Sequence, residues 1–157
     1  MSLKNYTTKV SAARSIAEIT DALVRLGASG VGIRYEKGLA CGLTFQVEVG
    51  GRSVIYELPA DWPAFKRALA VTYKIKRAEP DSDDARAYAH RVAWRCIRDW
   101  VLAQAALIET EMVDSATVFL PYATTDNGQT VAARMIRVLE YGGDPQLQLP
   151  WPAADQD

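Results

Sequence analysis

The sequence has little of the chemistry from which catalytic and metal sites are built. It contains one histidine, His90, and two cysteines, Cys41 and Cys96, which lie far apart and form no spacing typical of a metal or redox motif. No residues near His90 have the spacing of a zinc site, a Ser-His-Asp arrangement or a Cys-His pair. We therefore expect no catalytic residues, metal ligands or cofactor, with His90 either on a helix surface or half-buried, and both cysteines as buried free thiols.

Neither sign of charge dominates, and long apolar runs are missing. The chain has 18 Lys and Arg against 19 Asp and Glu, a net charge of -1, so no global field attracts nucleic acid or anionic lipid. No stretch approaches the roughly 20 apolar residues that span a bilayer, and the polar first ten residues lack the apolar core of a secretory signal. We expect no membrane association and a cytoplasmic location.

The first periodic segment predicts an N-terminal helix. Apolar residues recur at helical spacing, and Ser15 with Glu18 has the pattern of a capping box. Gly27 is expected to end this helix. The apolar positions are Ile16, Ile19, Leu23 and Leu26.

Alternating apolar residues then predict a three-stranded antiparallel meander from residue 31 to residue 58. In the second hairpin, a two-residue turn at Gly50-Gly51 places Phe45 opposite Tyr56, so pairing and apolar face agree. In the first hairpin, a two-residue turn would put Tyr35 and Ile33 on the wrong face. We therefore expect a three-residue loop over residues 37–39.

The C-terminal half is predicted to be helical. Asp61 caps a helix over residues 62–73, and Asp81 or Ser82 caps a long helix that reaches about Met112. A short helix around Val131 to Leu139 follows. The fold class is therefore α+β, with one domain over residues 1–143 and an extended or flexible tail over residues 144–157.

Two clusters of basic residues are the candidate binding site. Residues 63–78 contain several basic side chains and no acidic one, with aromatic rings between them. Three arginines on the long helix are spaced four and three apart, so they share a face, which we expect to look outward. The predicted nucleic-acid-binding residues are Lys74, Lys76, Arg77, Arg91, Arg95 and Arg98.

Several segments resemble a family of small uncharacterised phage and prophage proteins. They are YTTKV at residues 6–10, AYAHRVAWRCIRDWV at residues 87–101, IETEMV at residues 108–113 and VFLPY at residues 118–122. The resemblance covers most of the chain apart from the tail, and it brings no catalytic residue with it. It implies a mobile-element context, in the cytoplasm of a host cell, rather than a particular activity.

Our preferred hypothesis is a non-catalytic accessory protein that binds nucleic acid in phage DNA metabolism through the basic clusters. The same surface could dock an acidic protein, so the alternative is a protein that binds and inhibits a host defence or metabolic protein. An enzyme with a site assembled from scattered residues is a third, less favoured alternative. The apolar stripe of the long helix also suggests a homodimer.

Overall fold

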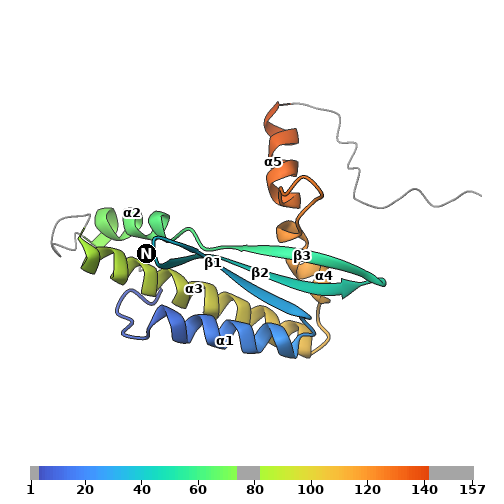
Figure 1. Ribbon diagram of the computed structural model, residues 1–157, viewed down its shortest axis with the longest axis horizontal. Coiled ribbons are helices and arrows are strands. Elements are labelled where there is room, and N and C mark those ends of the chain that lie inside the picture. The colour runs from blue at the N-terminus through green and yellow to red at the C-terminus, as the bar shows by residue number, and fades with distance from the viewer. Residues whose placement is uncertain (1–3, 74–81, 142–157) are drawn as a thin grey trace, which may run out of the picture.

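The computed structural model describes residues 4–73 and 82–141, and its elements follow the predicted α+β order (Figure 1). The three-stranded antiparallel sheet has the strand order β1-β2-β3. Helices α1 and α3 pack together on one face of the sheet, and α2 packs against α3. The predicted tail, residues 144–157, lies outside the described residues. The elements are α1 (Ala12–Arg25), β1 (Gly30–Glu36), β2 (Leu39–Val49), β3 (Arg52–Pro59), α2 (Trp62–Tyr73), α3 (Asp83–Glu109), α4 (Ser115–Phe119), the 3-10 helix η1 (Leu120–Tyr122) and α5 (Val131–Tyr141).

Helix α1 begins earlier than predicted. Ser11 is its N-cap, because the Ser11 side chain accepts a hydrogen bond from the backbone N–H of Arg14 at 3.2 Å. Ser15 lies inside the helix and is fully buried, so the predicted capping box with Glu18 is wrong. The apolar periodicity identifies the helix but not its first turn, because the N-cap, Ser11, is polar and lies before the periodic residues. Gly27 ends the helix as predicted, with φ at +92°.

The β2–β3 hairpin has the predicted register. Phe45 lies opposite Tyr56 and Leu43 opposite Leu58, across a turn of two glycines whose φ angles are +58° and +76°. The rings of Phe45 and Tyr56 stack with centroids 5.0 Å apart. Cross-strand pairing and side-chain packing therefore stabilise the same register.

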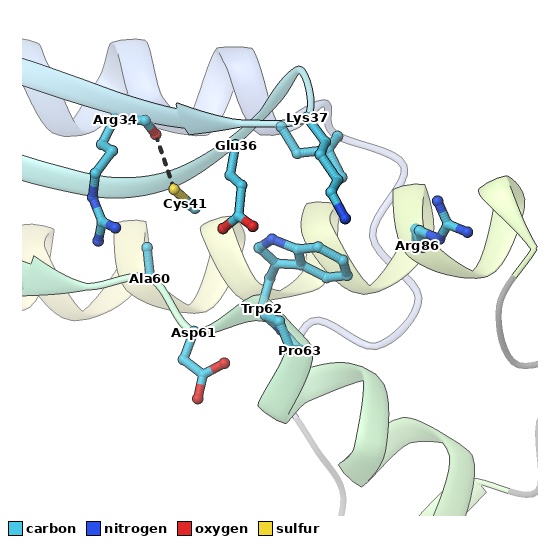
Figure 2. Close-up of a pocket in the computed structure, with 10 residues that line it drawn as sticks. Arg34, Glu36, Lys37, Cys41, Ala60, Asp61, Trp62, Pro63 and Arg86 are labelled. Atoms are coloured by element: carbon cyan, nitrogen blue, oxygen red, sulfur yellow. Dashed lines mark hydrogen bonds between the residues drawn. The ribbon is translucent and has the colours of Figure 1, made fainter.

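The β1–β2 hairpin differs from the prediction in its turn. The turn has two residues, Lys37 and Gly38, which adopt the left-handed φ angles (+49° and +79°) of a type I′ turn. The register shifts between Arg34 and Tyr35, which leaves Cys41 as a bulge on β2. This bulge restores the apolar face that the short turn alone would reverse. Figure 2 shows the Cys41 thiol donating to the carbonyl oxygen of Arg34 at 3.5 Å.

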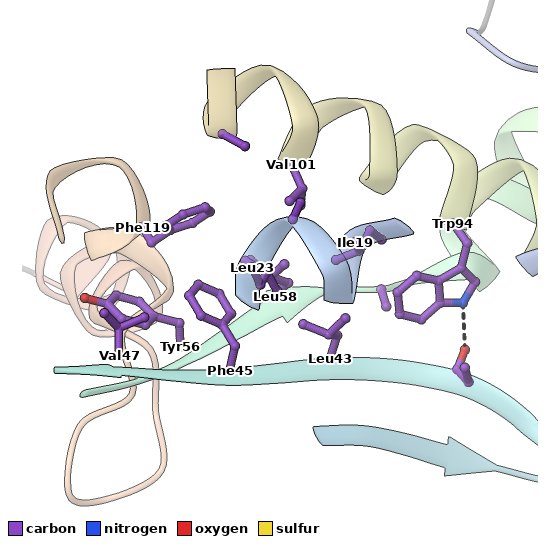
Figure 3. Packing of buried hydrophobic residues seen from close by; sticks show 14 of the residues in the cluster. Ile19, Leu23, Leu43, Phe45, Val47, Tyr56, Leu58, Trp94, Val101 and Phe119 are labelled. Carbon is purple, nitrogen blue, oxygen red and sulfur yellow. Dashed lines mark hydrogen bonds between the residues drawn. The ribbon is translucent and has the colours of Figure 1, made fainter. Parts of the chain in front are cut away.

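The core fills the space between the sheet and helices α1 and α3 (Figure 3). Phe119 of α4 closes one end of the core, where its ring contacts Phe45 edge-on at 5.0 Å and Trp100 at 5.9 Å. Burial of each large apolar side chain contributes about 1.5–3 kcal/mol, so this cluster dominates the stability of the fold. Its fully buried large members include Ile19, Leu23, Leu43, Leu58, Trp94, Val101 and Phe119.

Helix α2 has the predicted bounds, Trp62–Tyr73, and the predicted cap. The Asp61 carboxylate accepts a hydrogen bond from the backbone N–H of Ala64 at 3.1 Å. Leu69 of α2 is buried against Val92 of α3 in a second, smaller apolar cluster. This cluster attaches α2 to α3 beyond the edge of the main core.

Helix α3 also begins where predicted but ends sooner. Ser82 caps it by accepting a hydrogen bond from the backbone N–H of Ala85 at 3.2 Å. The helix ends at Glu109 rather than near Met112, because Glu111 adopts a left-handed φ of +58° that no α-helix can include. Helix α5 covers the segment predicted for the last helix.

Candidate functional site

The predicted basic surface does not form as expected. Lys74, Lys76 and Arg77 lie outside the described residues. Arg95 and Arg98 face α1, where both guanidinium groups bind the carboxylate of one residue. Their side chains are only 21% and 25% exposed, so the prediction of an outward-facing arginine stripe is wrong. A single apolar stripe identifies one contact side of a helix, but α3 contacts α1 and α2 as well as the sheet.

Glu18 of α1 is the shared partner of these arginines. Its Oε2 lies 3.2 Å from Arg95 Nη1 and 2.5 Å from Arg98 Nε. The hydrogen bond from Arg98 lowers the pKa of Glu18, and it outweighs the opposite effect of burial. Both arginines therefore form ion pairs within the fold, where the single negative charge of Glu18 is shared among Arg95, Arg98 and Arg14, which lies 3.2 Å from Glu18 Oε1.

A second carboxylate, Asp99, connects the N-terminal segment to α3. It accepts hydrogen bonds from Asn5 Nδ2 at 3.0 Å and Arg98 Nη1 at 3.0 Å, and its Oδ2 lies 3.1 Å from Lys4 Nζ. Burial alone would raise the pKa of Asp99, but the hydrogen bonds from Asn5, Lys4 and Arg98 lower it to about 2. Arg98 thus bridges two carboxylates.

Arg91, the third predicted arginine, is half-buried. Its guanidinium carbon lies 5.9 Å from the ring centroid of Tyr88, within the range of a cation–π contact. Its Nε is buried and has no hydrogen-bond partner in the part of the chain that the structure describes. Arg91 lies on the same face of α3 as Arg95 and Arg98, with its guanidinium against the ring of Tyr88.

His90 is buried and belongs to the packing of the core. It is 8% exposed, so it is buried more deeply than the helix-surface or half-buried position that the sequence predicted. Its Nε2 lies 2.9 Å from the carbonyl oxygen of Ala40, and Trp94 Nε1 donates to the same oxygen at 3.1 Å. Burial lowers the pKa of His90, and the contact with Ala40 opposes this only in part. The imidazole is therefore held neutral as part of a buried hydrogen-bonded group.

The cysteines offer no metal site either. Cys41 and Cys96 are free and half-buried, rather than buried as expected. Burial raises the pKa of Cys96, which disfavours a reactive thiolate. Within residues 4–73 and 82–141, no group of three or more His, Cys, Asp and Glu residues is arranged to hold a metal ion.

Helix α5 is the most distinctive surface feature of the molecule. Figure 1 shows it standing out from the layers formed by the sheet, α1 and α3. Its base is held by hydrogen bonds: the N–H of Val131 donates to Ala123 O at 2.9 Å, and the N–H of Thr124 donates to Ile55 O of β3 at 2.8 Å. Helix α5 packs on η1, so one of its sides is covered.

The other side of α5 carries an apolar strip. Ile136 is 54% exposed and Leu139 is 77% exposed, and both lie on one face with the half-buried Ala132. The charged residues Arg137 and Glu140 lie on the solvent-facing side next to this strip. The sequence pattern predicted the helix and its apolar positions, but it could not show that two of them are left uncovered.

A comparison with protein-family models, curated proteins and solved structures found no match to this chain. Across residues 4–73 and 82–141, no helix combines the length and apolarity needed to cross a lipid bilayer.

Proposed function

We propose that this protein is a non-catalytic binding protein that docks a partner protein through the exposed apolar face of α5. The observation that supports this is the position of Ile136 and Leu139, large apolar side chains that α5 holds in solvent away from the core. Exposed apolar side chains occur singly on most surfaces, but a strip on a projecting amphipathic helix is typical of helix-in-groove recognition.

The spacing of these residues defines what the partner must offer. Ala132, Ile136 and Leu139 are four and three residues apart, as are the anchors of helices that bind in apolar grooves. We therefore propose a partner with an apolar groove that accepts one face of a helix. A host or phage protein in this role stays a prediction from the sequence resemblance.

Nucleic-acid binding is less well supported among the described residues, because Arg95 and Arg98 form ion pairs with Glu18 and are only partly exposed. It stays a prediction for Arg91, Arg95 and Arg98 and for Lys74, Lys76 and Arg77. The homodimer predicted from the apolar stripe of the long helix stays a prediction, and a second copy could also occupy α5.

The experiment compares three forms of the protein: the wild type, the double variant Ile136→Glu and Leu139→Glu, and the control Val24→Glu. Val24 lies on α1 and is 56% exposed, so the control introduces one glutamate at another exposed apolar site, against two in the double variant. A partner captured from host lysate is purified, and its dissociation constant with each form is measured by calorimetry. We expect the double variant to weaken binding by about a hundredfold or more, and the control to bind like the wild type.

Two other outcomes would contradict the proposal. If the double variant binds the purified partner as tightly as the wild type, α5 is not the docking surface. If nuclease treatment abolishes capture, the partner is held through nucleic acid. Sedimentation of the wild type at high concentration checks for self-association, and a dimer that the double variant abolishes identifies a second copy as the occupant of α5.

A further inference from the structure

A cavity of about 510 Å³ opens where the β1–β2 turn meets the first residues of α2 and α3 (Figure 2). It lies at the opposite end of the sheet from the base of α5, so an inference about it does not depend on the proposed function. Its volume is in the range of small-molecule sites, about 300–1,000 Å³. Its lining combines an aromatic wall, three cations and two carboxylates.

The aromatic wall is the indole of Trp62. Figure 2 shows this ring reaching toward the β1–β2 turn, with the side chains of Glu36 and Lys37 extending toward it. Behind the ring, the imidazole of His90 meets Trp62 edge-on, with centroids 6.2 Å apart and planes at 88°. Because His90 itself is fixed to Ala40 O, the indole is supported from the core side. A supported ring that borders an open cavity can stack on a flat ligand.

Three cations surround this wall: Arg34, Lys37 and Arg86. The guanidinium of Arg34 lies over Gly42, where an added Cβ would be 3.0 Å from Nη2, so the missing side chain makes room for it. Arg34 binds Glu57 at 3.2 Å through Nη2 alone, which leaves other donors of its guanidinium for a ligand. Arg86 Nη1 lies 3.4 Å from Oδ1 of Asp83, a carboxylate that is 98% exposed. The side chains of Arg34 and Arg86 are 64% and 44% exposed.

The same cavity also presents hydrogen-bond acceptors. Glu36 ends β1 and is exposed, and its carboxylate extends toward Trp62. Asp61 accepts from the N–H of Ala64 through Oδ1, and its Oδ2 lies 3.9 Å from Arg67. A purely anionic ligand would be repelled by these carboxylates, and a purely cationic one by the three basic residues.

We propose that this cavity binds a nucleotide, with its base stacked on Trp62 and its phosphate near Lys37 and Arg86. A nucleotide carries the three features that the lining complements: a flat ring, N–H donors on the edge of the base and an anionic phosphate. Glu36 accepts from the base edge. An inorganic phosphate would leave the indole unused, and an aromatic carboxylate would leave Glu36 without a donor.

The test is an NMR titration of the full chain with AMP, GMP, CMP and UMP, followed at the indole N–H signal of Trp62 and assigned with Trp62→Phe. The corresponding nucleosides and inorganic phosphate are titrated in parallel. We expect the nucleotides to shift the Trp62 signal. We expect nucleosides and inorganic phosphate each to bind at least about tenfold more weakly than the nucleotides. The double variant Lys37→Gln and Arg86→Gln should weaken nucleotide binding by about tenfold, because a charge-assisted contact is lost.

The matched control is Arg137→Gln, which removes one exposed positive charge from α5 and should bind nucleotides like the wild type. Glu36→Gln should change the order of preference among the four bases, and it should not weaken phosphate binding, because it removes a carboxylate that repels the anion. An undisturbed spectrum of each variant confirms that it folds. The proposal is overturned if millimolar nucleotide does not shift the Trp62 signal, if phosphate alone binds as tightly, or if the Lys37 and Arg86 variant behaves like the control.

Discussion

The contacts of Asp99 with the N-terminal segment and with Arg98 should stabilise the fold by an amount that depends on pH. Its side chain is 16% exposed and is bound by Lys4, Asn5 and Arg98. These contacts lower the pKa of Asp99 from 3.8 to about 2, which corresponds to about 2 kcal/mol of stability at neutral pH. Replacing Asp99 by Asn removes the charge but keeps the size of the side chain. We therefore expect Asp99→Asn to lower the free energy of unfolding at pH 7 by about 2 kcal/mol.

The pH dependence follows from the direction of the shift. Because the folded protein holds the ionised form of Asp99 more strongly than the unfolded chain, the stabilisation is present above pH 4 and is lost as the pH falls to about 2. About half of it should already be lost at pH 3. The difference between wild type and Asp99→Asn should therefore shrink to about 1 kcal/mol at pH 3.

Urea unfolding followed by circular dichroism at pH 7 and pH 3 measures both quantities. The exposed Asp21 of α1 provides a matched control, since Asp21→Asn makes the same chemical change on the solvent side of a helix. A difference below about 0.5 kcal/mol at pH 7, or a difference that is the same at pH 3 as at pH 7, would refute the reasoning.

Three further predictions test other parts of the fold. NMR titration of the single histidine, His90, should give a pKa below 6.5, because burial disfavours the charged imidazole. The stability that depends on the neutral form should be present above pH 6.5 and decrease as the pH falls through the lowered pKa. A pKa at or above 6.5 would contradict the effect of burial. Gly38→Ala should lower the free energy of unfolding in urea by about 1 kcal/mol, because Gly38 has a φ of +79°. In the control Gly30→Ala, the added Cβ meets no atom within 4 Å, so stability should change by less than about 0.5 kcal/mol. Equal effects of the two substitutions would count against the left-handed turn. Replacing Arg98 by Gln should lower the urea midpoint because Glu18 loses a partner, and an unchanged midpoint would return this arginine to the candidate binding surface.

The local signals of the sequence predicted most elements, because each depends on residues within a few positions. The cap at Asp61 and the stop at Gly27 are decided by their own backbone groups. The pairing of Phe45 with Tyr56 follows from a two-residue turn and a period of two. The β1–β2 turn was missed because Lys37 adopts a left-handed conformation that its residue type does not indicate, with a compensating bulge at Cys41.

The candidate sites could not be predicted in the same way. The sequence showed that the arginines of α3 share a face, but not that Glu18, 77 and 80 residues away along the chain, covers Arg95 and Arg98. It showed the apolar positions of α5, but not which of them the rest of the molecule leaves uncovered. The Trp62 cavity combines the β1–β2 turn with the starts of two helices, and no local pattern relates these segments.

The sequence by itself determined the α+β class, the meander, the extent of α2 and the absence of a dominant charge. Hydrophobic period and capping depend on neighbouring residues, and composition is a property of the whole chain, so none of them requires the packed structure. Only the tertiary structure decided which charged groups are paired, that His90 is buried, and that Ile136 and Leu139 are exposed. Burial and pairing depend on which distant segments pack against a residue. An apolar stripe does not identify its partner, and only the packed structure shows whether it has one.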